Sequence, residues 1–150
     1  MATATDAELI LKLYELRTEG LLRKARHFMA IEFHPKTLEE LLEVTRGFGT
    51  EKNAYWRQVT SYWEMAASFV LHGTLNRDLF LEPSFSGEMF VIYGKIEPFL
   101  KELREKMQSP TIFGNVEKVI ATSEGAPERL KQTQERLAKL RQAAQSNKAA

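Results

Sequence analysis

The chain has 150 residues, of which 43% are hydrophobic and 27% charged, and it contains no cysteine. A chain of this length can bury about two-thirds of its unfolded surface in one domain, so its folding needs no covalent or metal staple. The lack of cysteine excludes disulfide bonds, thiolate metal sites and a cysteine nucleophile. The formal net charge of +1 provides no global field that would attract nucleic acid.

The N-terminal segment MATATDAELILKLYELR carries acidic side chains early and lacks the basic region, apolar region and cleavage site of a secretory signal. No run of apolar residues approaches the ~18 that a membrane span requires. We therefore expect a cytoplasmic protein without a membrane span.

The first predicted helix runs from Thr5 to about Phe33. Thr5 and Glu8 have the spacing of a capping box, in which the two side chains satisfy free backbone amides reciprocally. Leucines then recur every three or four residues, as on the buried face of a helix. Gly20 weakens the helix locally, and Pro35 ends it.

A short helix is expected from Thr37, with Glu40 completing a second capping box, to about Arg46. The next helix spans about 50–72, and Gly73 is a suitable left-handed terminator. One apolar stripe follows that helix, and it consists of Trp56, Val59, Trp63, Ala66 and Val70.

One or two helical turns at 76–82 should end at Pro83, after which Ser86 caps a helix over 86–107. Pro98 removes a backbone amide inside that helix, so we expect a kink or break there. The inner face of this helix is Met89, Ile92, Tyr93, Ile96, Phe99, Leu100 and Leu103.

Ser109 and Pro110 begin another short helix, and Pro127 begins the last one. The last helix should run to about residue 145 and leave residues 146–150 as a disordered tail.

These elements predict an all-α fold in one domain over residues 1–150. We expect an irregular bundle in which the two central helices pack antiparallel because their connection is short. The terminal helix over 127–145 is the member that can lie at the periphery. The longer helices are those at about 5–33, 50–72, 86–107 and 126–145, with about three short helices closing the bundle.

A polar stripe lies opposite the tryptophans of the 50–72 helix. Arg57, Glu64, Ser68 and His72 follow one another at helical spacing, and Tyr93 of a neighbouring helix is a further candidate. One interpretation is a ligand pocket in which Glu64 and His72 act as acid, base or binding groups. The other is a solvated face of the kind that every amphipathic helix has.

No other catalytic or metal-binding pattern is present. His27, His34 and His72 have neither the spacing of a zinc protease nor that of a di-iron bundle. No nucleophile elbow and no phosphate-binding glycine loop occurs. We therefore expect no metal, no cofactor and no catalytic residue.

The last helix suggests association. Leu130, Leu137 and Leu140 fall on positions typical of a coiled-coil seam, although two heptads alone bury too little to hold a dimer. The same face can instead pack on its own domain. From Ala126 onward the chain has six basic residues against two acidic ones, which would suit an anionic partner or merely complement a helix dipole. Nucleic acid is an unlikely partner, since no recognition helix is evident.

Three stretches carry a resemblance to known proteins: KLYELRTEGLLRKARHF, NAYWRQVTSYWEMAASFVLHG and SGEMFVIYGKIEPFLKELR. Over roughly residues 8–106 the chain resembles a family of small, uncharacterised bacterial helical proteins, a domain of unknown function. The resemblance implies a bacterial source and a helical fold, and it carries over no activity, cofactor or site residue.

From these features we expect a non-enzymatic interaction or structural module that forms a homo-oligomer or docks a protein partner. The alternative is a small-ligand-binding or hydrolytic helical protein that uses the Glu64, Ser68 and His72 face.

Overall fold

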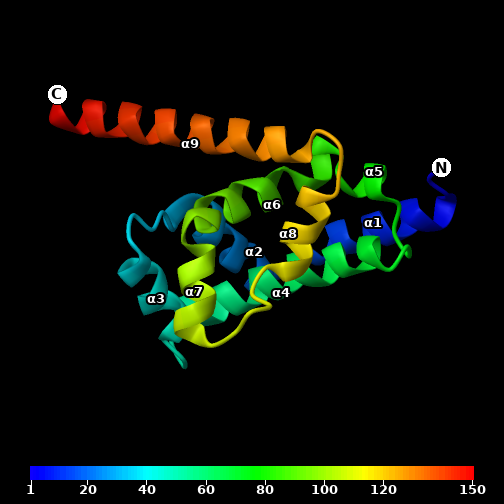
Figure 1. Ribbon diagram of the computed structural model, residues 1–150, viewed down its shortest axis with the longest axis horizontal. Helices are drawn as coiled ribbons and strands as arrows, with labels where there is room; N and C mark the ends of the chain where they lie inside the picture. Colours follow the sequence, from blue (N-terminus) through cyan, green and yellow to red (C-terminus); the bar gives the residue numbers. More distant parts are fainter.

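The computed structural model describes residues 1–150 and contains helices only, which confirms the all-α prediction (Figure 1). The elements in chain order are α1 (Ala4–Leu16), α2 (Gly20–His27), the π-helical turn η1 (Phe28–Glu32), α3 (Leu38–Arg46), α4 (Glu51–Leu71), α5 (Arg77–Phe80), α6 (Pro83–Ile96), the 3-10 turn η2 (Glu97–Phe99), α7 (Leu100–Met107), α8 (Gly114–Ala121) and α9 (Ala126–Ala149).

Helix α4 runs through the body of the molecule and packs against α2, α3, η1 and α8. Helix α6 packs mainly against α9, which crosses the molecule as one long rod (Figure 1). The expected antiparallel pairing of the two central helices is therefore indirect. Side chains of α4 and α6 meet in the core, where the ring of Trp63 lies edge-on to that of Phe85 with the centroids 5.5 Å apart. The helices whose backbones lie nearest to α4 are instead α2 and α8.

The prediction of one helix over 5–33 is wrong, because the chain turns after Leu16. Arg17 at this turn is buried, and its Nη2 donates to the carbonyl oxygen of Phe85 at 2.6 Å. The Glu19 carboxylate then caps α2 by accepting from the amides of Leu21 and Leu22. The Glu19 carboxylate thus satisfies two amides that the start of α2 leaves free, and the Arg17 bond fixes the turn against α6.

The start of this region also differs from the prediction. Thr3 rather than Thr5 caps α1, and the reciprocal partner is Asp6 rather than Glu8. Asp6 in addition accepts from the amide of Asn76 at 2.7 Å, so the cap is fixed by a contact far away in sequence. At the predicted second box, the Thr37 side chain caps α3 as expected, whereas the Glu40 carboxylate accepts from the backbone amide of Lys36 instead.

Helix α4 agrees with the predicted 50–72 helix to within one residue at each end. The Thr50 hydroxyl caps it by accepting from the amide of Asn53 at 3.2 Å. Gly73 ends it with a φ of +72°, a left-handed conformation that glycine adopts without strain.

Pro83 and Pro98 both lie at helix boundaries, as predicted, but Pro83 lies at the start of a helix and not at the end of one. Pro83 opens α6 rather than closing the preceding helix, because a missing amide costs nothing in a first helical turn. Ser86 is consequently inside α6 and fully buried, not its cap. Pro98 does interrupt the predicted 86–107 helix, as expected, and separates α6 from α7 by the 3-10 turn η2.

Helix α8 starts later than predicted, and α9 starts where it was expected but ends later. α8 begins at Gly114 rather than at Ser109, after Phe113 in a left-handed conformation with a φ of +54°. α9 continues to Ala149, beyond the expected end at 145.

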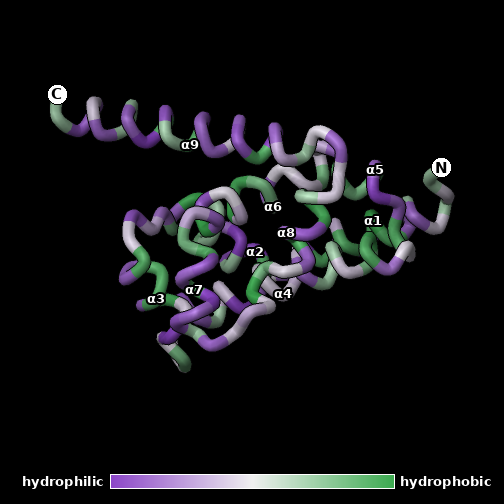
Figure 2. The backbone as a smooth tube through the Cα atoms, viewed as in Figure 1, coloured by the Kyte–Doolittle hydropathy of each residue, from purple (hydrophilic) through white to green (hydrophobic).

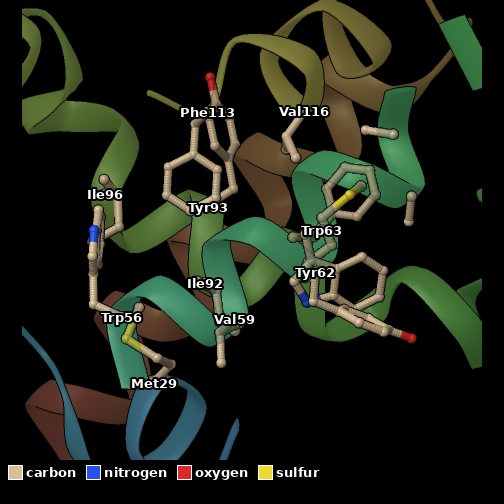
Figure 3. Close-up of a cluster of buried hydrophobic side chains, with 14 of the residues drawn as sticks. Met29, Trp56, Val59, Tyr62, Trp63, Ile92, Tyr93, Ile96, Phe113 and Val116 are labelled. Atoms are coloured by element: carbon tan, nitrogen blue, oxygen red, sulfur yellow. The ribbon is translucent and has the colours of Figure 1, made fainter. Parts of the chain in front are cut away.

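The core consists of 31 buried hydrophobic residues. Trp63 is fully buried, and its ring makes edge-to-face contacts with Tyr62, Phe80 and Phe85. Figure 3 shows Trp63 and Tyr62 within the buried cluster. Such aromatic pairs contribute about 0.5–1.5 kcal/mol each beyond area burial. The expectation that Trp56, Trp63, Ile92, Ile96 and Leu103 all face inward is confirmed.

Candidate functional site

Glu64, the first candidate from sequence, caps a neighbouring helix. Its Oε1 accepts from the amide of Val116 at 2.9 Å and its Oε2 from that of Asn115 at 3.2 Å, so the carboxylate lies at the N-terminus of α8. Burial raises the pKa of Glu64, and the two amide donors oppose that rise. The carboxylate therefore ties α4 to α8, and its oxygens are already engaged.

The other residues of the predicted polar stripe are held within their own helix. Arg57 is exposed and donates to Asn53 one turn earlier, and the Ser68 hydroxyl donates to the carbonyl oxygen of Met65. His72 is exposed at the C-terminal end of α4.

Tyr93 lies apart from this stripe, inside the core. Its ring packs against Phe113 with centroids 5.7 Å apart, and burial raises the pKa of the phenol (Figure 3). None of the five principal surface clefts is lined by Arg57, Glu64, Ser68 or His72, or by Tyr93. None of these five clefts brings the residues together, and their role in ligand binding stays a prediction.

The three leucines singled out on the last helix have different surroundings. Leu130 packs against the hydrophobic core, and Leu137 lines a cleft between α9 and α6. Leu140 is 60% exposed. The predicted seam is thus divided: its first part serves intrachain packing, and its last part faces solvent.

Sequence reasoning missed a buried lysine, Lys95 of α6, which is 5% exposed. Its Nζ donates to the carbonyl oxygens of Met29, of Ala30 at 3.2 Å and of Phe33 at 2.8 Å. These carbonyls belong to η1 and the residue after it, where a π-helical bond joins the Phe33 amide to the Phe28 oxygen at 2.8 Å. Three ammonium protons therefore match three acceptors that the helix end leaves free.

Lys95 has no carboxylate partner within ion-pair distance. Burial, followed by the nearby charge of Arg141, lowers its pKa to about 7. A sequence signal did exist, since Lys95 follows Ile92 by three residues and precedes Phe99 by four. That spacing puts it on the apolar face of α6.

Beside Lys95 lies an open cleft of about 480 Å³, which we call the α9 cleft. Its walls are the chain between η1 and α3, the end of α6 with η2, and the middle of α9. The lining residues that matter below are Pro35, Lys36, Lys95, Phe99, Leu137 and Arg141.

Polar contacts hold α9 over this cleft. Gln134 donates through Nε2 to the carbonyl oxygen of Gly94 at 3.1 Å and to the Glu97 carboxylate at 3.0 Å. The Arg141 guanidinium, in contrast, makes no hydrogen bond to the protein, and its Nε is shielded from solvent without a partner.

Two properties of the whole chain bear on the earlier expectations. No helix combines the length and the apolar character that crossing a membrane demands. No group of three or more histidine, aspartate or glutamate side chains is arranged to hold a metal ion.

A family model, that of a domain of unknown function (DUF4760), matches residues 2–123. No curated protein and no solved structure matches the chain. The matched residues extend from the start of α1 to the end of α8, and α9 follows them.

Proposed function

The chain belongs to the DUF4760 family, a domain of unknown function, and we propose that it is a non-enzymatic structural module that associates with a second copy of itself through α9. The observation that carries the proposal is a pair of exposed, oppositely charged surfaces at one end of the molecule. Figure 1 shows that the C-terminal end of α9 and helix α3 lie toward the same end of its long axis.

The end of α9 is basic. After Glu135 the chain has four basic residues and no acidic one. Of the four, Arg136, Lys139 and Lys148 are exposed, whereas Arg141 lines the α9 cleft. Leu140 adds an exposed apolar side chain to this surface. Two α9 helices side by side would oppose like charges, so direct α9–α9 pairing is disfavoured.

Helix α3 has the complementary character. Glu39, Glu40 and Glu43 are exposed on it, and Phe48 just beyond its end is 73% exposed. An acidic helix with a neighbouring aromatic side chain suits the basic surface of α9 and Leu140. A two-fold axis would let each α9 contact the α3 of the other copy, which doubles the contact and closes the assembly.

Light scattering over a micromolar concentration series at low ionic strength tests this proposal. We expect dimers that dissociate as salt is added, because exposed charges are screened within about 10 Å at 0.1 M salt. A chain that stays monomeric throughout the series at low ionic strength would contradict the proposal.

Charge reversal makes the test specific. One variant replaces Glu39, Glu40 and Glu43 by lysine, and a second replaces Arg136 and Lys139 by glutamate. Each alone should be monomeric, whereas the equimolar mixture should form heterodimers because both contacts are then complementary. The exposed pair Glu8→Lys and Lys12→Glu on α1 is the matched control and should leave wild-type association unchanged. Failure of the mixture to associate would rule out the α9–α3 contact.

A further inference from the structure

Positive charge gathers around the α9 cleft without an equal amount of negative charge. Lys36, Lys95 and Arg141 line the cleft together with a single carboxylate, that of Glu97, which already accepts from Gln134. Desolvation, followed by the charges of Lys95 and Arg141, lowers the pKa of nearby His34. The contributions of the two cations agree with an uncompensated positive potential in the cleft.

Arg141 is the group in this cleft that lacks a partner. A guanidinium has five N–H donors, and burying one of them without an acceptor is unfavourable. The Nε of Arg141 is in that situation, and no carboxylate lies within ion-pair distance of its side chain. Lys36 at the opposite wall likewise has no ion-pair partner.

Lys95 contributes in a different way. Its three ammonium protons are directed at the carbonyl oxygens of Met29, Ala30 and Phe33, so none is left to bind a ligand. Its charge nevertheless acts at short range inside a partly desolvated wall, where electrostatic interactions are stronger than in water.

The cleft also has apolar walls, formed by Pro35, Phe99 and Leu137. Its volume of about 480 Å³ falls within the range of small-molecule sites, about 300–1,000 Å³, and exceeds what a bare inorganic anion fills. An occupant with both a charged oxygen group and a small apolar body matches these walls.

We propose that the α9 cleft binds a small organic oxyanion, a carboxylate or phosphate monoester, through the Arg141 guanidinium and the Lys36 ammonium. The planar guanidinium pairs with two oxygens of either group, and the apolar body of the ligand lies against Phe99 and Leu137. This site is separate from the α9–α3 contact, since it uses the inner face of α9 and not Arg136, Lys139 or Leu140.

The test is an NMR titration that follows the backbone amide resonances of Lys36, Phe99 and Leu137, which line the cleft and are present in every variant, and in the wild type also the side-chain Nε–H resonance of Arg141. Benzoate and phenyl phosphate serve as probes, each at an ionic strength held constant with sodium chloride. We expect a saturable shift with at least one of them. A shift with benzoate alone identifies carboxylates as the ligand class, and a shift with phenyl phosphate alone identifies phosphate monoesters.

Three variants distinguish hydrogen bonding of the probe by the Arg141 guanidinium from non-specific attraction of an anion to positive charge. Arg141→Gln should weaken probe binding roughly tenfold or more, as expected for loss of a charge-assisted hydrogen bond. Arg141→Lys keeps the charge and should give an intermediate affinity. Lys139→Gln removes an equal charge two residues away, outside the cleft, and should bind as the wild type does.

The inference is overturned if neither probe produces a saturable shift, or if Arg141→Gln binds a probe as tightly as the wild type. It is equally overturned if chloride alone at the same ionic strength reproduces the shift. A monomeric chain that still binds a probe would leave this site standing and remove only the proposed self-association.

Discussion

Helices α4 and α9 are both long, yet they have opposite roles in the structure. α4 has 21 residues and supplies both tryptophans of the core. α9 has 24 residues and supplies only Ala126 to the set of 31 core residues. In Figure 2 α9 is coloured mainly as hydrophilic along its length. The length of a helix thus says little about its contribution to the free energy of unfolding, which depends on the apolar area that the helix buries.

What holds α9 in place is correspondingly more polar. Arg129 donates to the carbonyl oxygen of Leu81 at 2.6 Å, and its guanidinium lies 4.0 Å from the centroid of the Phe90 ring. Leu130 adds an apolar contact to the core. We infer that α1 to α8, the part matched by the family, forms a stable unit on which α9 lies as a peripheral element.

The largest difference between α4 and α9 is expected in the loss of stability caused by one alanine substitution in each helix. Trp63→Ala should lower the free energy of unfolding by about 3–5 kcal/mol, because it empties a fully buried aromatic site. Leu140→Ala should change it by less than about 0.5 kcal/mol, since that side chain is mostly exposed. Urea denaturation followed by tryptophan fluorescence and circular dichroism measures both. Similar losses for the two variants would contradict the contrast.

Lys95 lies where the two regions meet, and its titration should appear in the pH dependence of stability. Its pKa is lowered from 10.5 in the unfolded chain to about 7 in the folded one, so between these values the unfolded state binds more protons. The free energy of unfolding should therefore rise with pH above 7, with each unit of pKa difference worth about 1.4 kcal/mol.

The matched variant for this effect is Lys95→Met, which keeps an unbranched side chain, one atom shorter, and removes the titrating group. The variant should lose the rise between pH 7 and about pH 10, where Tyr93 of the unfolded chain begins to ionise, whereas burial raises the pKa of this phenol in the folded one. Three other titratable groups act on Lys95 or its surroundings, namely His34, Glu88 and Arg141, and all three remain in the variant. Parallel stability profiles for the two proteins would show that Lys95 is not the responsible group.

A smaller effect is expected at Glu64. Glu64→Gln keeps one oxygen that can accept from Asn115 or Val116 but places an NH2 donor opposite the other backbone N–H, which loses its acceptor at a cost of about 1 kcal/mol. Thermal unfolding measures the loss. If Glu64 instead binds a ligand, a metabolite found by screening should raise the melting temperature of the wild type but not that of Glu64→Gln or His72→Ala.

The elements that the sequence predicted well are those whose signals are local. Thr50 and Gly73 delimit α4 through contacts with their own neighbours, and Pro98 breaks its helix through its own ring. The turn at Arg17 has no such local cause, because the acceptor of its guanidinium, Phe85, is 68 residues away. A hydrogen bond between residues so far apart produces no recurring pattern of residue types from which it could be predicted.

The candidate sites show the same division. The polar stripe of α4 was visible as a pattern, but only coordinates reveal that Glu64 points at the N-terminus of α8. The α9 cleft combines residues from three distant segments, around Lys36, Lys95 and Arg141, so no sequence window contains it. The signal available in advance was the single charged position on the apolar face of α6.

Native-state hydrogen exchange tests most directly whether α9 lies on a core that is stable without it. Amides in the middle of α4 and α6 should exchange only through global unfolding, whereas those of α9 beyond Arg141 should exchange through local opening at far lower free energy. Removal of residues 126–150 should leave the protection of α4 close to that of the full chain. Equal protection along α9 and α4, or loss of α4 protection after the truncation, would contradict the account.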